Sequence, residues 1–230
     1  GLLPRGACSG GYSFIMTGCP ATNMLVSTYM KDLMKKTKPS HAYEAIKRNH
    51  APGGMMSYES ADDLKFYVKK GYCPGNAGKT LEWAFQDWGL SRMALRMGKK
   101  SDAALYEKRS RAWTPLFNKN IGLILPKKEN GEWLHTDPLN GQGWVEANAW
   151  QATWSVSHDL PKLVELMGGG DAFCEKLNYA FEQARPTDFV HAYSGGYVSY
   201  ANQPGCSNAH LFTYGGQPWL TQYWVRQVKE

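Results

Sequence analysis

The segment of this sequence best suited to chemistry places one carboxyl group among indoles and amides. Residues 144–154 read WVEANAWQATW, with Glu146 flanked by three tryptophans and by the amide of Asn148. Indole faces suit the apolar faces of a sugar ring, and amides match its hydroxyl groups. A carboxyl held among aromatic rings is partly desolvated, which favours the protonated form that a general acid needs. Glu146 is therefore the candidate acid, and Asn148 and Trp150 are candidate substrate contacts, although from residue types alone a glutamate in a helix's first turn beside core tryptophans is the commoner explanation.

A second loop, residues 197–205 with the sequence YVSYANQPG, carries oxygen donors. Asn202 and Gln203 offer carbonyl oxygens, and calcium accepts neutral oxygens alongside carboxylates and water. The same residues also fit an ordinary turn in which the asparagine side chain bonds the backbone. We treat Asn202 and Gln203 as candidate metal ligands, Gln203 also as a candidate sugar contact. His210, which follows the loop, is a further candidate sugar contact.

A third polar cluster lies in the segment 79–88, KTLEWAFQDW. Glu82 and Gln86 are four residues apart and share one face of a predicted helix, where they could line a cavity or simply form a polar surface. Elsewhere the sequence has no nucleotide-binding glycine motif, and its six histidines show no metal-ligand spacing. The spacing singles out no nucleophilic triad.

Composition narrows the class of protein. The 230 residues are 43% hydrophobic and 20% charged, the balance of a folded globular chain. Lysines account for much of the net charge of +6 and fall in separate small groups, mostly near predicted helix C-termini, where cations offset the helix dipole. This pattern favours a solvated surface over a nucleic-acid partner. Five cysteines without metal spacing are expected to be buried thiols, and no apolar run reaches the roughly 20 residues of a membrane span.

Hydrophobic spacing predicts an all-α chain that forms a single unit over residues 1–230. Long loops rich in Gly, Trp, Tyr and Asn separate the helices, which favours an α/α toroid over a compact bundle. The last helix runs to the end of the chain without a stop signal, and the first residues resemble no signal peptide, so we expect an internal piece of a longer protein. The expected elements are helices over 23–36, 43–49 and 79–97, a helix capped by Ser60 and ended by Gly71, and helices capped by Ser101-Asp102, by Asp159 (reaching residue 167) and by Asp171. A strand is expected over 121–125 and a last helix from 218. The apolar residues expected to pack inward are Phe173, Leu177, Ala180 and Phe181 after Asp171, and Leu220, Tyr223, Trp224 and Val228 in the last helix.

Taken in order along the chain, these segments resemble glycoside hydrolase family 92, the calcium-dependent exo-acting α-mannosidases. The most specific match is the Glu-x-Asn-Ala-Trp-Gln core that begins at Glu146. Shorter matches precede and follow it. They are residues 3–5, 18–29, 80–88, 156–159, 200–204, 210–212 and 217–219.

The resemblance implies that the chain is the middle of an (α/α)6 catalytic domain, incomplete at both ends. It implies an inverting α-mannosidase that processes N-glycans and other mannose-containing glycans, secreted or periplasmic, with Glu146 as general acid and calcium near Asn202 and Gln203. The base, a second carboxylate roughly 6.5–9.5 Å from the acid, is expected beyond residue 230, so this piece alone should be inactive. Many family members carry an acidic residue in the loop that here reads Ala201-Asn202-Gln203-Pro204, which puts linkage preference and calcium affinity in doubt.

Two other functions stay open. A glycan-binding relative could keep the aromatic loops and lack the base. Another glycan-active toroid enzyme, such as a polysaccharide lyase, would use a tyrosine or histidine base instead of an acid and a water.

Overall fold

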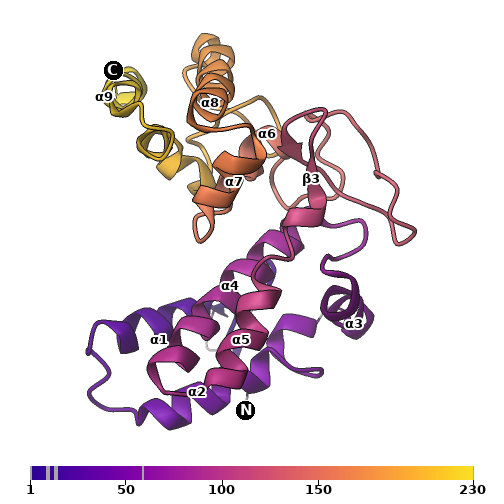
Figure 1. Ribbon diagram of the computed structural model, residues 1–230, viewed down its shortest axis with the longest axis vertical. Helices are drawn as coiled ribbons and strands as arrows, with labels where there is room; N and C mark the ends of the chain where they lie inside the picture. The colour runs from indigo at the N-terminus through magenta and orange to yellow at the C-terminus, as the bar shows by residue number, and fades with distance from the viewer. Residues whose placement is uncertain (1, 9–10, 13–14, 59, 230) are drawn as a thin grey trace. The chain divides into compact units, whose positions relative to one another are not determined.

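The structure, a computed structural model, describes residues 2–8, 11–12, 15–58 and 60–229 (Figure 1). Helices dominate it, which confirms the predicted all-α class. Contacts within the chain group the residues into two compact units, Gly1–Pro74 with Lys79–Pro115, and Gly75–Gly78 with Leu116–Glu230. The single helical unit expected over residues 1–230 stays a prediction.

In its described residues the first unit contains five α-helices and one pair of short strands. Its core lies where α1, α2, α4 and α5 present apolar side chains to one another, among them Tyr43, Ile46, Leu90 and Met93, all buried. Its elements are β1 (Ala7–Cys8), antiparallel to β2 (Gly11–Tyr12), α1 (Ala21–Met30), α2 (Pro39–Asn49), the 3-10 turn η1 (Met55–Ser57), α3 (Ala61–Lys70), α4 (Ala77–Arg96, of which 79–96 belong here), α5 (Lys100–Arg109) and the start of η2 (Thr114–Leu116).

Helix ends in this unit follow local chemistry. The Ser60 side chain accepts a hydrogen bond of 3.1 Å from the Asp63 N–H, and Gly71 ends α3 at a φ of 84°, as predicted. The predicted cap at Ser101-Asp102 was wrong, because α5 begins at Lys100. The Asp102 carboxylate instead accepts hydrogen bonds from Tyr43 and Lys47, which tie α5 to α2.

The second unit has short elements joined by long loops. The strand expected at 121–125 forms at Leu123–Ile124, and the predicted inward face of α8 (Phe173, Leu177, Ala180, Phe181) is confirmed, since all four are fully buried. Its elements are β3 (Phe117–Asn118), antiparallel to β4 (Leu123–Ile124), α6 (Ala149–Ala152), η3 (Thr153–Ser155), α7 (Leu160–Leu166), α8 (Gly170–Ala184), η4 (Arg185–Thr187), η5 (Gln203–Thr213) and α9 (Pro218–Lys229).

Two expectations for this unit needed correction. Asp171 does not cap α8, which begins one residue earlier with Gly169 at the cap position, so Asp171 lies in the first turn. Of the apolar residues expected to pack from α9, Trp224 alone is buried, and its indole N–H donates to Asn178 Oδ1 at 2.7 Å.

Cysteine and membrane expectations can be checked over part of the chain. The four cysteines whose side chains are described are free thiols, three of them buried and Cys206 exposed. In the part of the chain that the structure describes, no helix combines the length and apolar character that crossing a membrane requires.

Candidate active site

Glu146 lies in the loop before α6, in the second unit. Helix α6 begins only at Ala149, with Asn148 as its cap, so Glu146 is outside the helix and adopts a φ of 53°. A non-glycine residue in this left-handed region is uncommon and is held there by its surroundings. The alternative explanation of a glutamate that stabilises a helix's first turn therefore does not apply.

The loop that precedes Glu146 depends on a glycine. Gly143 has a φ of 85°, and a Cβ atom at this position would lie 2.7 Å from a side-chain carbon of Pro126. Both the conformation and the close approach exclude larger residues. Its carbonyl oxygen accepts a hydrogen bond of 2.8 Å from the Ala77 N–H, which fixes the loop at its start.

Asn202 contacts Glu146 although 56 positions separate them in the sequence. Its Nδ2 donates to Glu146 Oε2 at 3.3 Å and to the Glu146 carbonyl oxygen at 3.4 Å. The two segments singled out separately in the sequence thus meet in the structure. Glu146 is half-buried, and its Oε1 makes no hydrogen bond to the described residues. One carboxyl oxygen is therefore held while the other stays available to carry a proton.

The Asn202 loop is shaped by its own turn chemistry. Asn202 Oδ1 accepts a hydrogen bond of 3.0 Å from the Gln203 N–H and so caps η5. Gly205 is required there, because a Cβ atom would lie 1.8 Å from the Ser199 carbonyl oxygen. The turn and the contact with Glu146 use opposite ends of one amide. Gln203 and His210 are exposed, and among the described residues neither side chain forms a hydrogen bond with Glu146.

The side chain of Asn148 forms hydrogen bonds that hold the loop at 194–196 against the start of α6. It is fully buried, its Nδ2 donates to the carbonyl oxygens of Ser194 at 3.0 Å and Gly196 at 2.8 Å, and its Oδ1 accepts from the Gln151 N–H. The Gln151 side chain donates to the Gly195 carbonyl oxygen. These bonds tie the 194–196 turn to α6, and the predicted contact of Asn148 with a sugar stays a prediction.

Trp150 belongs to an aromatic cluster with Tyr179 and Tyr197, at ring-centroid distances of 5.5 and 5.1 Å. Lys176 Nζ lies 5.3 Å from the centroid of the indole. Trp150, Lys176 and Tyr179 line a hollow of about 430 Å³ that does not include Glu146. The sequence analysis did not identify Lys176, Tyr179 and Tyr197 as neighbours of Trp150, because they come from separate segments of the chain. The Gly195-Gly196 pair was a local sign of the turn that precedes Tyr197.

The oxygen atoms near Glu146 are of the types that bind calcium, but they are fewer than a calcium ion requires. A carboxylate and the amides of Asn202 and Gln203 are ligands that calcium accepts, yet calcium takes six to eight oxygens. Among the residues that the structure describes, no group of three or more His, Cys, Asp and Glu side chains could hold a metal ion. A calcium site here would need further oxygen ligands, so the calcium assignment stays a prediction.

The Glu82 cluster lies in the first unit. Glu82 and Gln86 share one face of α4, as their spacing predicted, and Gln86 Nε2 donates to Glu82 Oε1. Gln86 Oε1 accepts from the Cys19 N–H at 2.7 Å. Burial raises the pKa of Glu82, and the hydrogen bond from Gln86 opposes that rise. Glu82 lines a hollow of about 530 Å³ with Arg5 and Met16. The guanidinium of Arg5 is largely committed to structure, because it donates to three backbone carbonyl oxygens.

Comparison with known sequences identifies a catalytic domain. The sequence profile described as "Glycosyl hydrolase family 92 catalytic domain" matches residues 1–230. An uncharacterized secreted glycosidase of Arthroderma benhamiae is 24% identical, over 96% of this chain and 32% of its own length.

Solved structures give the same result. The family GH92 α-mannosidase BT3965 from Bacteroides thetaiotaomicron superposes with a TM-score of 0.85 at 25% identity, over 99% of this chain and 30% of that protein. The family GH92 inverting mannosidase BT2199 from the same bacterium gives 0.84 at 28% identity, over 99% of this chain and 33% of its own. The chain therefore spans about a third of the length of the proteins it matches.

Proposed function

Because this chain belongs to glycosyl hydrolase family 92, we propose that the protein is an exo-acting, inverting α-mannosidase that removes terminal mannose from glycans. Support for the substrate comes from BT3965 and BT2199, which are both mannosidases, the second an inverting one. The observation that carries the proposal is the contact between Asn202 and Glu146, because it joins the two segments on which the family resemblance rests.

In the proposed reaction Glu146 is the general acid. As the bond between the sugar's anomeric carbon and the glycosidic oxygen breaks, the carboxyl proton passes to that oxygen, which leaves as an alcohol. Asn202 holds Oε2 by a hydrogen bond, so Oε1 carries the proton towards the substrate. On the opposite face a second carboxylate takes a proton from the attacking water, which inverts the configuration. We propose that this base lies outside residues 1–230.

Calcium is proposed as the cofactor, with Asn202 and Gln203 supplying oxygen ligands. When bound, it would polarise and orient the hydroxyl groups of the sugar. Asn202 Oδ1 accepts one hydrogen bond, from the Gln203 N–H, and keeps a second lone pair for a cation, while the Gln203 side chain is exposed and can supply its own oxygen. We also propose that the protein is secreted, since its fungal relative is described as a secreted glycosidase.

The test is an assay of the intact protein on α-mannobiosides, with and without a calcium chelator, for the wild type and Glu146→Gln. We expect calcium-dependent release of mannose and a fall in kcat of about 10²- to 10⁴-fold in the variant. Glu129→Gln is the matched control, because Glu129 is exposed in the same unit and its side chain forms no hydrogen bond or ion pair with the described residues; it should leave kcat unchanged.

The leaving group sharpens this test. An aryl mannoside with an acidic phenol as leaving group needs little protonation, so Glu146→Gln should lose far less activity on it than on a mannobioside. An equal loss on both substrates would remove Glu146 from the acid role. Binding of mannosides without release of mannose would favour the glycan-binding alternative, and an unsaturated sugar product would favour a lyase.

A further inference from the structure

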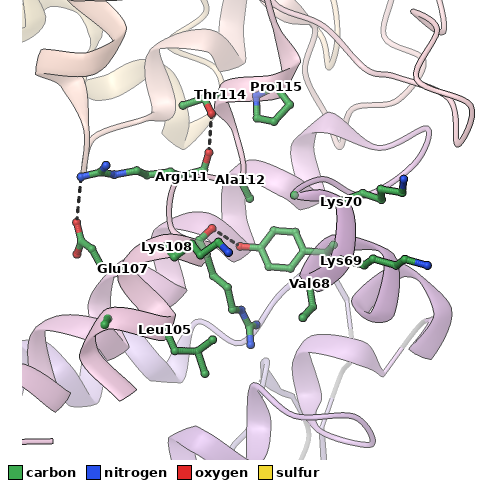
Figure 2. Close-up of a pocket in the computed structure, with 14 residues that line it drawn as sticks. Val68, Lys69, Lys70, Leu105, Glu107, Lys108, Arg111, Ala112, Thr114 and Pro115 are labelled. Atoms are coloured by element: carbon green, nitrogen blue, oxygen red, sulfur yellow. Dashed lines mark hydrogen bonds and ion pairs between the residues drawn. The ribbon is translucent and has the colours of Figure 1, made fainter. Parts of the chain in front are cut away.

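A hollow in the first unit carries an excess of positive charge. It has a volume of about 680 Å³ and lies between the C-terminal ends of α3 and α5 (Figure 2). We call it the basic groove. Five cations and one carboxylate, Glu107, line it. The cations are Lys69 and Lys70 from α3, and Lys108, Arg109 and Arg111 from α5 and the turn after it.

Two of these cations are already paired within the protein. Arg109 Nε donates to Asp87 at 2.8 Å, and Arg111 lies 3.8 Å from Glu107. Glu107 is bonded to Arg92 as well. The three lysines are exposed, and none has a carboxylate partner among the described residues. Three ammonium groups are therefore available to a ligand.

Cations at a helix C-terminus are ordinary, since they offset the helix dipole. The basic groove differs because the terminal lysines of two separate helices belong to the lining of one hollow. Two exposed apolar side chains share that lining. Val68 is 54% exposed and Leu105 is 48% exposed. The groove thus combines a charged rim with an apolar surface.

We propose that the basic groove binds an anionic polysaccharide, through sulfate or carboxylate groups on its sugars. Each ammonium group can pair with one such anion, and Val68 and Leu105 can contact the apolar faces of the rings between them. The one aromatic side chain in the lining, Tyr67, is buried, so the groove lacks the stacking surface that single-stranded nucleic acids use. This inference does not depend on mannosidase activity, because it concerns binding in the first unit.

The experiment measures binding of the intact protein to heparin as the sulfated probe, polygalacturonate as the carboxylated probe, and an uncharged mannan. The variant carries Lys69→Gln, Lys70→Gln and Lys108→Gln. The control carries Lys35→Gln, Lys36→Gln and Lys38→Gln, which removes the same charge from exposed lysines in the same unit, outside the groove.

We expect at least one anionic probe to bind in a salt-sensitive manner, and the groove variant to weaken it about tenfold. The control variant should change the affinity less than about twofold, and thermal unfolding should show that both variants fold. Binding of heparin alone would indicate recognition of sulfate groups, and binding of polygalacturonate alone would indicate recognition of carboxylate groups. Equal weakening by the two variants, or no binding of either probe, would overturn the proposal. Equally tight binding of duplex DNA of matched length would assign the groove to polyanions in general and overturn it too.

Discussion

Two carboxylates of this chain, Asp87 and Glu146, are held in opposite ways. Asp87 in the first unit is fully buried and accepts hydrogen bonds from His50 at 2.8 Å, Tyr67 at 2.9 Å and Arg109 at 2.8 Å. Glu146 in the second unit is half-buried and accepts one side-chain hydrogen bond, from Asn202.

The difference separates a structural carboxylate from a reactive one. A buried carboxylate whose two oxygens both accept hydrogen bonds joins helices and has no free oxygen to offer a substrate. A carboxylate with a free oxygen in an accessible loop contributes little to stability and can take part in chemistry. Both residues belong to sequence segments that match family 92, so the resemblance alone does not distinguish their roles.

The largest expected effect on stability comes from Asp87→Asn. An amide leaves Arg109 and His50 without a buried counter-charge, so we expect the free energy of unfolding to fall by about 3–5 kcal/mol. Chemical denaturation of the intact protein measures this loss of stability. Hydrogen exchange should show faster exchange in α2, whose C-terminal cap is His50, and in α4, which contains Asp87.

Glu146→Gln is the matched comparison for that variant. It should leave stability within about 0.5 kcal/mol of the wild type, as substitutions away from buried networks do, while it removes activity. If Glu146→Gln destabilises the protein as much as Asp87→Asn does, the contrast between the two carboxylates fails.

A smaller effect follows from the histidine beside Asp87. Burial by itself lowers the pKa of His50, but the neighbouring Cys19 and the hydrogen bond that His50 donates to Asp87 outweigh it and raise that pKa to about 9. A raised folded-state pKa stabilises the protein fully below about pH 6.5, and this contribution disappears as the pH rises to about 9. We therefore expect the free energy of unfolding to fall by up to about 3 kcal/mol across this range.

The same denaturation measurement at a series of pH values checks this, with His50→Gln removing the pH-dependent part. His41→Gln is the control, because His41 lies on the same helix and is exposed. A stability that rises between pH 6.5 and 9, or one that His50→Gln leaves unchanged, would contradict the charge assigned to His50.

Local signals in the sequence predicted much of the fold. Ser60 and Gly71 bound α3 because capping chemistry involves neighbours a few residues apart. The cap expected at Asp102 failed for the opposite reason, since Tyr43 and Lys47, more than 50 positions away, bind its carboxylate. Residue types reveal short-range chemistry, whereas competition from distant side chains depends on the folded chain.

The candidate site shows the same limit. Glu146 and Asn202 were each recognisable from their own segments, but no pattern in the sequence placed them in contact. The preference of glutamate for the positive end of a helix dipole suggested a place in the first turn of a helix. The left-handed backbone at Glu146 could not be read from its residue type. The aromatic neighbours of Trp150 also come from other segments and become visible only after folding.

The smallest expected effect tests the one hydrogen bond that distinguishes Glu146. Asn202→Ala removes both the donor to Glu146 and the cap of η5, whereas Asn202→Ser keeps a capping hydroxyl but is too short to reach the carboxylate. If the bond orients the acid, both variants should lower kcat on α-mannobiosides about tenfold, within the contribution of one hydrogen bond to a charged group. Recovery of kcat by the serine variant would show instead that Asn202 acts by capping η5, and Glu146 would then need no partner to hold its proton in place.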